Sequence, residues 1–151
     1  MFLTKTNKAN LWIYPLILLP VILGGSIYLL FRVDSLLMFQ WLEFFDLKES
    51  LLRLRECIKI EFPDWVIFSL PDGLWLFSYV SFMLMIWRHK PSWQSFFWIG
   101  IMPFIAIASE VLQYFKVLVG TFDIMDIYAY LIGFLLAIVF IKNRINHEQV
   151  T

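Results

Sequence analysis

Apolar residues dominate four long stretches of the chain, and shorter polar stretches separate them. The four apolar stretches cover residues 11–31, 70–87, 93–119 and 123–141. A helix needs about 20 predominantly apolar residues to cross the roughly 30 Å hydrocarbon core of a bilayer, and each stretch meets or approaches that length. The pattern therefore predicts an all-α membrane protein, a four-transmembrane-helix bundle in which residues 1–151 form a single polytopic domain.

The segment 34–62, between the first two spans, has a different pattern. Leu47, Leu51, Leu54 and Ile58 recur at helical spacing and form one narrow apolar stripe. Charged side chains fill the rest of the segment and are too frequent for a helix surrounded by hydrocarbon. We predict an interfacial amphipathic helical segment and not a fifth span. It either lies on the membrane surface or is a linker whose apolar side packs on the bundle.

Composition supports a membrane protein and excludes several other classes. Apolar residues make up 61% of the chain and charged residues 16%, against about 45–50% and about 25% in soluble domains. The formal net charge is zero, so nothing indicates a nucleic-acid partner. The single cysteine, Cys57, excludes an intramolecular disulfide and a cysteine-rich metal site.

Polar residues interrupt the apolar pattern where the third span meets the fourth. An acid and an amide stand three residues apart at the end of the third span, and two acids stand three apart at the start of the fourth, so each pair shares a helix face. A charged group costs about 2.5–3.5 kcal/mol at the centre of a membrane helix, which favours mutual contact over exposure to lipid. The predicted ligand-binding pocket consists of Glu110, Gln113, Asp123 and Asp126, with Asp72 and Tyr130 at its edge.

Several carboxylates in one small volume require partial protonation or a positive charge among them. The candidate counter-charges are Arg32, Lys116 and a bound divalent cation, for which oxygen ligands would favour magnesium or calcium. No organic cofactor is indicated. The two histidines, His89 and His147, are expected on the opposite side of the membrane. Their position argues against a Ser-His-Asp or zinc hydrolase at the acidic site.

Helix capping is an alternative explanation for three of these acids. Asp72, Asp123 and Asp126 stand at predicted helix starts, where the helix dipole favours a negative charge. Glu110 stands near a helix end, where the dipole disfavours it. A ligand site or a polar network is therefore the better explanation for Glu110 and for Gln113, one turn away.

The residues around the predicted pocket also match a known motif. Ser109-Glu110-Val-Leu-Gln113, then Gly120-Thr121-Phe122-Asp123-Ile-Met-Asp126 and a glycine at 133, resembles the VanZ-like family of small bacterial membrane proteins. The match covers residues 109–137, and Pro71-Asp72-Gly73-Leu-Trp75 fits a subset of the family. Gly120 stands where an arginine is frequent in the family, and Tyr130 where an asparagine is usual.

The resemblance implies a multi-pass protein of the bacterial plasma (inner) membrane. The founding member of the family is associated with low-level resistance to the antibiotic teicoplanin, which is a cell-envelope phenotype. What the resemblance implies for this chain is therefore a role in the envelope, with glycopeptide-antibiotic resistance as the family's association.

Three functions are compatible with the sequence. The first is a non-enzymatic protein whose outer-leaflet pocket of acids and an amide binds a lipid or envelope headgroup or a cation. The second is a small structural or accessory subunit that binds other membrane proteins. The third is an intramembrane enzyme that uses paired carboxylates as acid and base, although no nucleophile or phosphate-binding motif accompanies them. Membrane lipid is the partner that the first function requires.

The distribution of basic residues predicts the orientation. Four spans place both termini and the turn at 88–91 on one side, and the basic residues of that side are crowded close to the span ends. Lys and Arg in such positions mark the cytoplasmic side. We therefore predict that both termini are cytoplasmic.

Cysteine-accessibility labelling tests this orientation. A cysteine at position 90 and a cysteine within 48–56 should react with a membrane-impermeant maleimide from opposite sides of the membrane. Labelling of both positions from the same side would contradict the topology.

Overall fold

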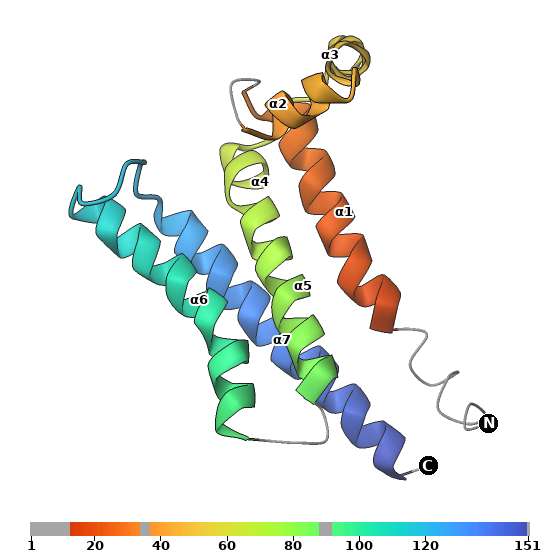
Figure 1. Ribbon diagram of the computed structural model, residues 1–151, viewed down its shortest axis with the longest axis vertical. Helices are drawn as coiled ribbons and strands as arrows, with labels where there is room; N and C mark the ends of the chain where they lie inside the picture. Colours follow the sequence, from red (N-terminus) through yellow and green to blue (C-terminus); the bar gives the residue numbers. More distant parts are fainter. Residues whose placement is uncertain (1–12, 34–36, 88–91, 151) are drawn as a thin grey trace.

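A computed structural model shows the arrangement of the chain in space (Figure 1), and it describes residues 13–33, 37–87 and 92–150. These residues form seven helices and no strand. Four stretches of helix are long and apolar enough to cross a membrane: Tyr14–Phe31, Asp64–Trp87, Trp93–Tyr114 and Ile124–Ile141. The predicted all-α membrane protein with four spanning helices is confirmed.

The second span is at the centre of the bundle. It consists of the short helix α4 (Asp64–Phe68) followed by α5 (Leu70–Trp87). Helix α5 contacts α1 (Ile13–Phe31), α6 (Trp93–Tyr114) and α7 (Ile124–Val150). In Figure 1, α1 runs along one side of α5, α6 lies on the other side, and α7 crosses α5. The described core residues Leu76, Phe77, Val80 and Ala137 come from α5 and α7, so this helix pair forms the interior.

Small residues let α5 and α7 approach very closely. A Cβ atom added at Gly133 would clash with the backbone oxygen of Gly73, and one added at Gly73 would lie 2.8 Å from the backbone oxygen of Ala129. Transmembrane helices use small residues in this way to bring their backbones together. Gly133 and Ala137 form the small-residue pair that the sequence offers for such an approach, and both are buried against α5.

The helix boundaries differ from the expected spans at two places. The second span begins at Asp64 and not near residue 70, with a break at Ser69, because Pro71 has no N–H to continue the hydrogen-bond ladder. Asp72 therefore lies about 12 Å inside the span, at 1.5 Å per residue from Asp64. Helix α6 ends at Tyr114 and not at 119, so the connection to α7 is longer than a tight turn and contains Lys116 and Gly120 at positive φ.

The interfacial segment forms two helices at one end of the bundle, α2 (Leu37–Phe44) and α3 (Lys48–Cys57). Figure 1 shows α3 nearly end-on beside the end of α1, so α3 runs across the bundle and not along it. The Arg55 guanidinium donates to the backbone oxygens of Leu29 (2.7 Å) and Arg32 (2.5 Å) and lies 4.7 Å from the Phe39 ring centre. A cation is favoured at a helix C-terminus, so Arg55 both caps α1 and holds α3 in place.

Part of this segment packs on the bundle, and part of it leaves apolar side chains exposed. Phe39 is fully buried beneath Arg55, as expected for a linker packed on the bundle. In contrast, α3 has no buried residue, and Leu47 and Leu54 of its apolar stripe are about half exposed. An exposed apolar stripe at the end of a membrane bundle is the arrangement of an interfacial helix.

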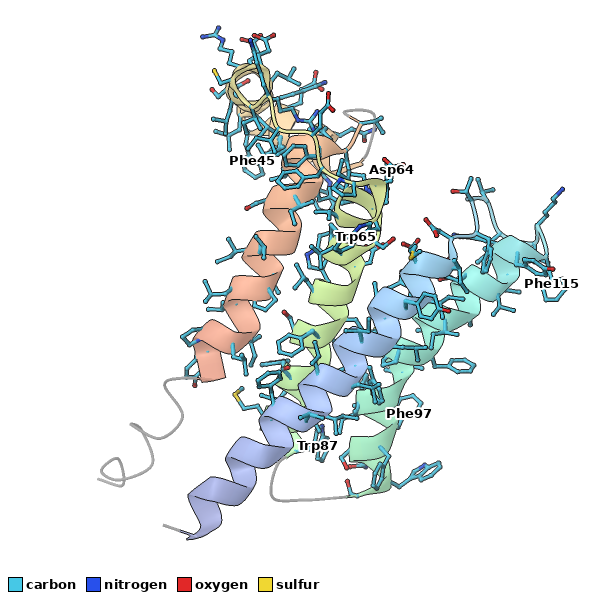
Figure 2. All side chains as sticks on the ribbon, turned by 180° about the vertical axis from the view of Figure 1, so that it is seen from behind. Phe45, Asp64, Trp65, Trp87, Phe97 and Phe115 are labelled. Carbon is cyan, nitrogen blue, oxygen red and sulfur yellow. The ribbon has the colours of Figure 1, made fainter. Side chains whose placement is uncertain are left out.

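Figure 2 shows the side chains at the two ends of the bundle. Asp64, Trp65 and Phe115 lie toward the end that carries α2 and α3, which we call the α3 end, whereas Trp87 lies toward the other. Tryptophan is enriched at both membrane–water interfaces. The acids of the predicted pocket come from the segments near the α3 end.

The close approach of α5 and α7 can be tested by a substitution that adds one methyl group at the crossing. Gly133→Ala should destabilise the protein by about 1–3 kcal/mol, because the added Cβ cannot be accommodated without moving a backbone. Gly100→Ala is the matched control, because a Cβ there meets no atom within 4 Å. Unfolding in mixed micelles, followed by circular dichroism, measures both. Equal stability of the two variants would contradict the close crossing.

Candidate functional site

Glu110 is the buried acid at the junction of α6 and α7. It lies one turn before the end of α6 and is only 4% exposed. Its Oε2 accepts a hydrogen bond from the backbone N–H of Asp123 at 3.3 Å. This contact forms because the connection after α6 returns the chain to the same end of the bundle, where α7 begins. Glu110 therefore binds the start of the neighbouring span.

Asp126 lies three residues after Asp123, in the first turn of α7. Its Oδ1 is buried and has no hydrogen-bond partner among the described residues. Asp126 interacts electrostatically with Glu110 and with Asp72. A buried acceptor without a donor costs about 1–3 kcal/mol, so this oxygen is an unsatisfied polar atom of the site.

Asp72, on α5, interacts with both Glu110 and Asp126. Its strongest electrostatic interaction is with Asp126, followed by weaker ones with Arg32 and Glu110. The sequence offered no local reason to place this helix beside the α6–α7 hairpin. The crossing of α5 and α7 explains the position of Asp72, because its chain neighbour Gly73 lies directly against α7. Asp72, Glu110 and Asp126, one from each of three spans, form what we call the acidic cluster.

Asp123 and Gln113 have other roles in the structure. The Asp123 side chain accepts a hydrogen bond from the backbone N–H of Met125 at 2.9 Å, so it caps α7, as the capping alternative proposed. Its backbone N–H donates to Glu110, and its carboxylate also interacts electrostatically with Glu110. The Gln113 side chain lies against Gly120 in the α6–α7 connection, where an added Cβ would come within 2.6 Å of its nitrogen. No described contact joins its amide to the carboxylates.

Tyr130 lies at the edge of the acidic cluster, as the spacing along α7 predicts. It interacts electrostatically with Asp72, Asp126 and Glu110, in that order. Its ring packs against the core that α5 and α7 share. Tyr130 therefore links the polar site to the apolar interior below it.

Arg32, at the end of α1, is the counter-charge of the acidic cluster. Its guanidinium interacts electrostatically with Asp72 and Tyr130 and donates to the backbone oxygen of Phe68 at 3.1 Å. It also lies over the Phe68 and Tyr28 rings, with 4.8 and 5.3 Å to their centres. The other candidate, Lys116, is exposed in the α6–α7 connection. Of the three carboxylates in the acidic cluster, Asp72 is the one with which Arg32 interacts.

The metal-ion hypothesis finds no geometric support within the part of the chain that the structure describes. No three side chains of the types His, Cys, Asp and Glu are grouped there so that they could hold a metal ion. His89 lies outside the described residues. A cluster of acids with one adjacent guanidinium is instead suited to ammonium and hydroxyl groups, which donate to carboxylates, and to an anion beside the arginine.

Sequence reasoning missed three buried serines in the second span. Ser69, Ser78 and Ser81 are 2%, 2% and 0% exposed, and their Oγ atoms have no hydrogen-bond partner among the described residues. Hydroxyl side chains inside membrane helices commonly bond across helices, so three serines in one apolar span were the available signal. Ser69 stands at the break between α4 and α5.

No protein-family model, curated relative or solved structure matches the chain.

The electrostatic interaction between Arg32 and Asp72 can be tested by a double-mutant cycle. Arg32→Gln should destabilise the protein because it leaves the acidic cluster without its cation. Asp72→Asn in the same chain should recover part of the loss, with a coupling energy within about 0.5–3 kcal/mol. Unfolding in mixed micelles measures each variant.

Arg53→Gln is the control for this cycle. Arg53 is 81% exposed and lies 3.9 Å from an exposed Glu49, so its removal should change stability by less than about 0.5 kcal/mol. Strictly additive effects of Arg32→Gln and Asp72→Asn would show that the two side chains do not interact.

Proposed function

We propose that the protein is a non-enzymatic membrane protein whose acidic cluster binds the polar headgroup of an envelope lipid or a similar amphiphile. The observation that carries the proposal is the Asp126 Oδ1, buried without a donor beside the buried Glu110. Buried polar groups are nearly always hydrogen-bonded. A ligand that donates to this oxygen would remove its desolvation penalty.

The charges around the cluster define the chemistry of that headgroup. Asp72, Glu110 and Asp126 accept hydrogen bonds when ionised and favour an ammonium group or several hydroxyls. Arg32, on the Asp72 side, donates to anions and suits a phosphate. A headgroup with an amine or a sugar next to a phosphate would match both parts. The position of the cluster near the α3 end agrees with a ligand at the membrane interface.

The resemblance to the VanZ-like family agrees with this proposal. We place the protein in the bacterial plasma membrane, with cytoplasmic termini and the acidic cluster in the outer leaflet. An outer-leaflet site would meet envelope lipids and their glycosylated precursors. Teicoplanin resistance, the association of the founding member, would then be one expression of headgroup binding.

Two conservative substitutions test headgroup binding. Glu110→Gln and Asp126→Asn keep the shape of each side chain and remove its charge. We expect both variants to fold and insert like the natural protein, because neither carboxylate forms an ion pair with a lysine or arginine among the described contacts. Losing one charge-assisted hydrogen bond, about 1.5–3 kcal/mol, should weaken lipid binding about tenfold or more.

Native purification in mild detergent, followed by lipid mass spectrometry, measures how much lipid each variant retains. Glu49→Gln is the matched control, because Glu49 is 88% exposed on α3. Unchanged lipid retention in both cluster variants would contradict headgroup binding. If the variants instead lose a co-purifying membrane protein or fail to accumulate, the accessory-subunit function is the correct one.

A further inference from the structure

The connection between α6 and α7 exposes an apolar surface at the α3 end of the bundle. We call residues 115–122 the apolar loop. Its exposed apolar side chains are Phe115, Val117, Leu118, Val119 and Phe122. Val119 is 101% exposed, so no other described residue covers it. Lys116 is the only charged residue between Glu110 and Asp123. An exposed apolar patch of this kind marks a surface that contacts a protein or a membrane.

The backbone of the first half of the apolar loop is hydrogen-bonded within the protein. The N–H groups of residues 115–118 donate to backbone oxygens in the last turn of α6, at 3.2, 2.9, 2.9 and 3.3 Å. Lys116 has a φ of 58°, the left-handed conformation that commonly closes a helix end in this way. Each unsatisfied backbone group costs several kcal/mol in lipid, so internal hydrogen bonds are the condition for irregular backbone at membrane depth. The first half of the loop meets that condition.

The second half of the apolar loop is also held against α6. Its Gly120 lies against the Gln113 side chain, and the backbone N–H of Asp123, the residue after the loop, donates to the Glu110 carboxylate. The rings of Tyr114 and Phe122, from the two ends of the loop, are in edge contact with 5.2 Å between their centres. The loop is therefore folded back on α6, and its apolar side chains are presented on a fixed frame.

The neighbouring spans indicate the depth of the apolar loop. Asp72 and Glu110 interact, so they lie at a similar level of the bundle. Asp72 lies about 12 Å inside the second span, measured from Asp64. Phe115 follows Glu110 by five residues, which corresponds to about 7.5 Å of helix. The loop therefore begins inside the level at which the second span starts.

The figures agree with this depth. Figure 2 shows Phe115 nearer than Asp64 to the middle of the molecule along the vertical axis. In Figure 1 the α6–α7 connection reaches about as far as α4, and α2 and α3 lie beyond both. Helix α4 belongs to a candidate membrane span, whereas α3 is the charged surface helix. The apolar loop thus lies level with the end of a span and not with the surface helices.

We propose that the apolar loop inserts into the interfacial layer of the bilayer, where Phe115, Val117 and Val119 contact the upper part of the lipid chains. Aromatic rings favour this layer. Lys116 suits it because a lysine can lay its stem on apolar surface while its ammonium group reaches the headgroup phosphates. Glycine would adopt the positive φ at less cost but would supply no cation. The surface is separate from the acidic cluster and requires no ligand there.

A fluorescent label at a single cysteine tests the proposal. In a Cys57→Ser background, Val119→Cys is labelled with the fluorophore NBD, and the full chain is placed in vesicles of phosphatidylethanolamine and phosphatidylglycerol. Lipids with a nitroxide near the headgroup end of the acyl chain should quench the label at 119. The dithionite anion should reduce this label about tenfold more slowly than a label at 53, because an anion partitions poorly into lipid.

Two labelled positions serve as controls. Arg53→Cys is on α3, where the side chain is 81% exposed, and it reports the aqueous side. Positions 53 and 119 lie at the same end of the bundle, so mixed insertion in the vesicles affects both equally. Phe104→Cys, at a residue 69% exposed on α6, reports ordinary contact with lipid. Val117→Cys repeats the measurement if Val119→Cys does not fold.

Two results would overturn the proposal. Reduction at 119 as fast as at 53 would place the apolar loop in water. Slow reduction without quenching by the nitroxide lipid would show that protein, such as a second copy of the chain, covers the loop in place of lipid. Neither readout depends on the ligand of the acidic cluster, so failure of headgroup binding and failure of this proposal are distinguishable.

Discussion

The contact between the backbones of α5 and α7 is the constraint on which the other features depend. In a membrane, burial of apolar side chains contributes little to helix association, so close packing and polar contacts must hold helices together. Gly73 and Gly133 allow that packing because neither has a side chain to keep the helices apart. The core and the position of the acids both follow from this contact.

The acidic cluster shows how packing brings polar residues together. Glu110 and Asp126 come close because α6 and α7 are consecutive in the chain, but Asp72 arrives from another helix through the crossing at Gly73. Three acids in one place would repel one another, and Arg32 offsets part of that repulsion from the end of α1. The site therefore depends on all four spanning helices, although its motif lies in two.

Sequence patterns predicted the features that depend on local chemistry. The spans followed from hydropathy, the amphipathic character of α3 from the spacing of its leucines, and the meeting of Glu110 with the start of α7 from a short connection. Features that depend on which helix faces which were beyond a single sequence. No local sequence pattern indicates that the second span begins at Asp64. None indicates that Arg32, and not Lys116, is the cation that interacts with Asp72.

The acidic residues also differ in whether their interactions are local or come from other helices. Capping is a local interaction, and the capping alternative proved correct for Asp123, whose carboxylate bonds within its own turn. A local explanation alone does not cover Asp72, which lies in the first turn of α5 but also interacts with Arg32, Glu110 and Asp126. Gln113 shares a helix face with Glu110, yet the longer connection places Gly120 beside it, and its amide is turned to the loop.

Arg32 is held at two points by different parts of the molecule. Its backbone oxygen accepts from Arg55 of the surface helix α3, while its guanidinium contacts the end of α4 and faces Asp72. Arg32 is thus held by both α3 and α4, so a displacement of α3 relative to α1 would move the charge that acts on Asp72.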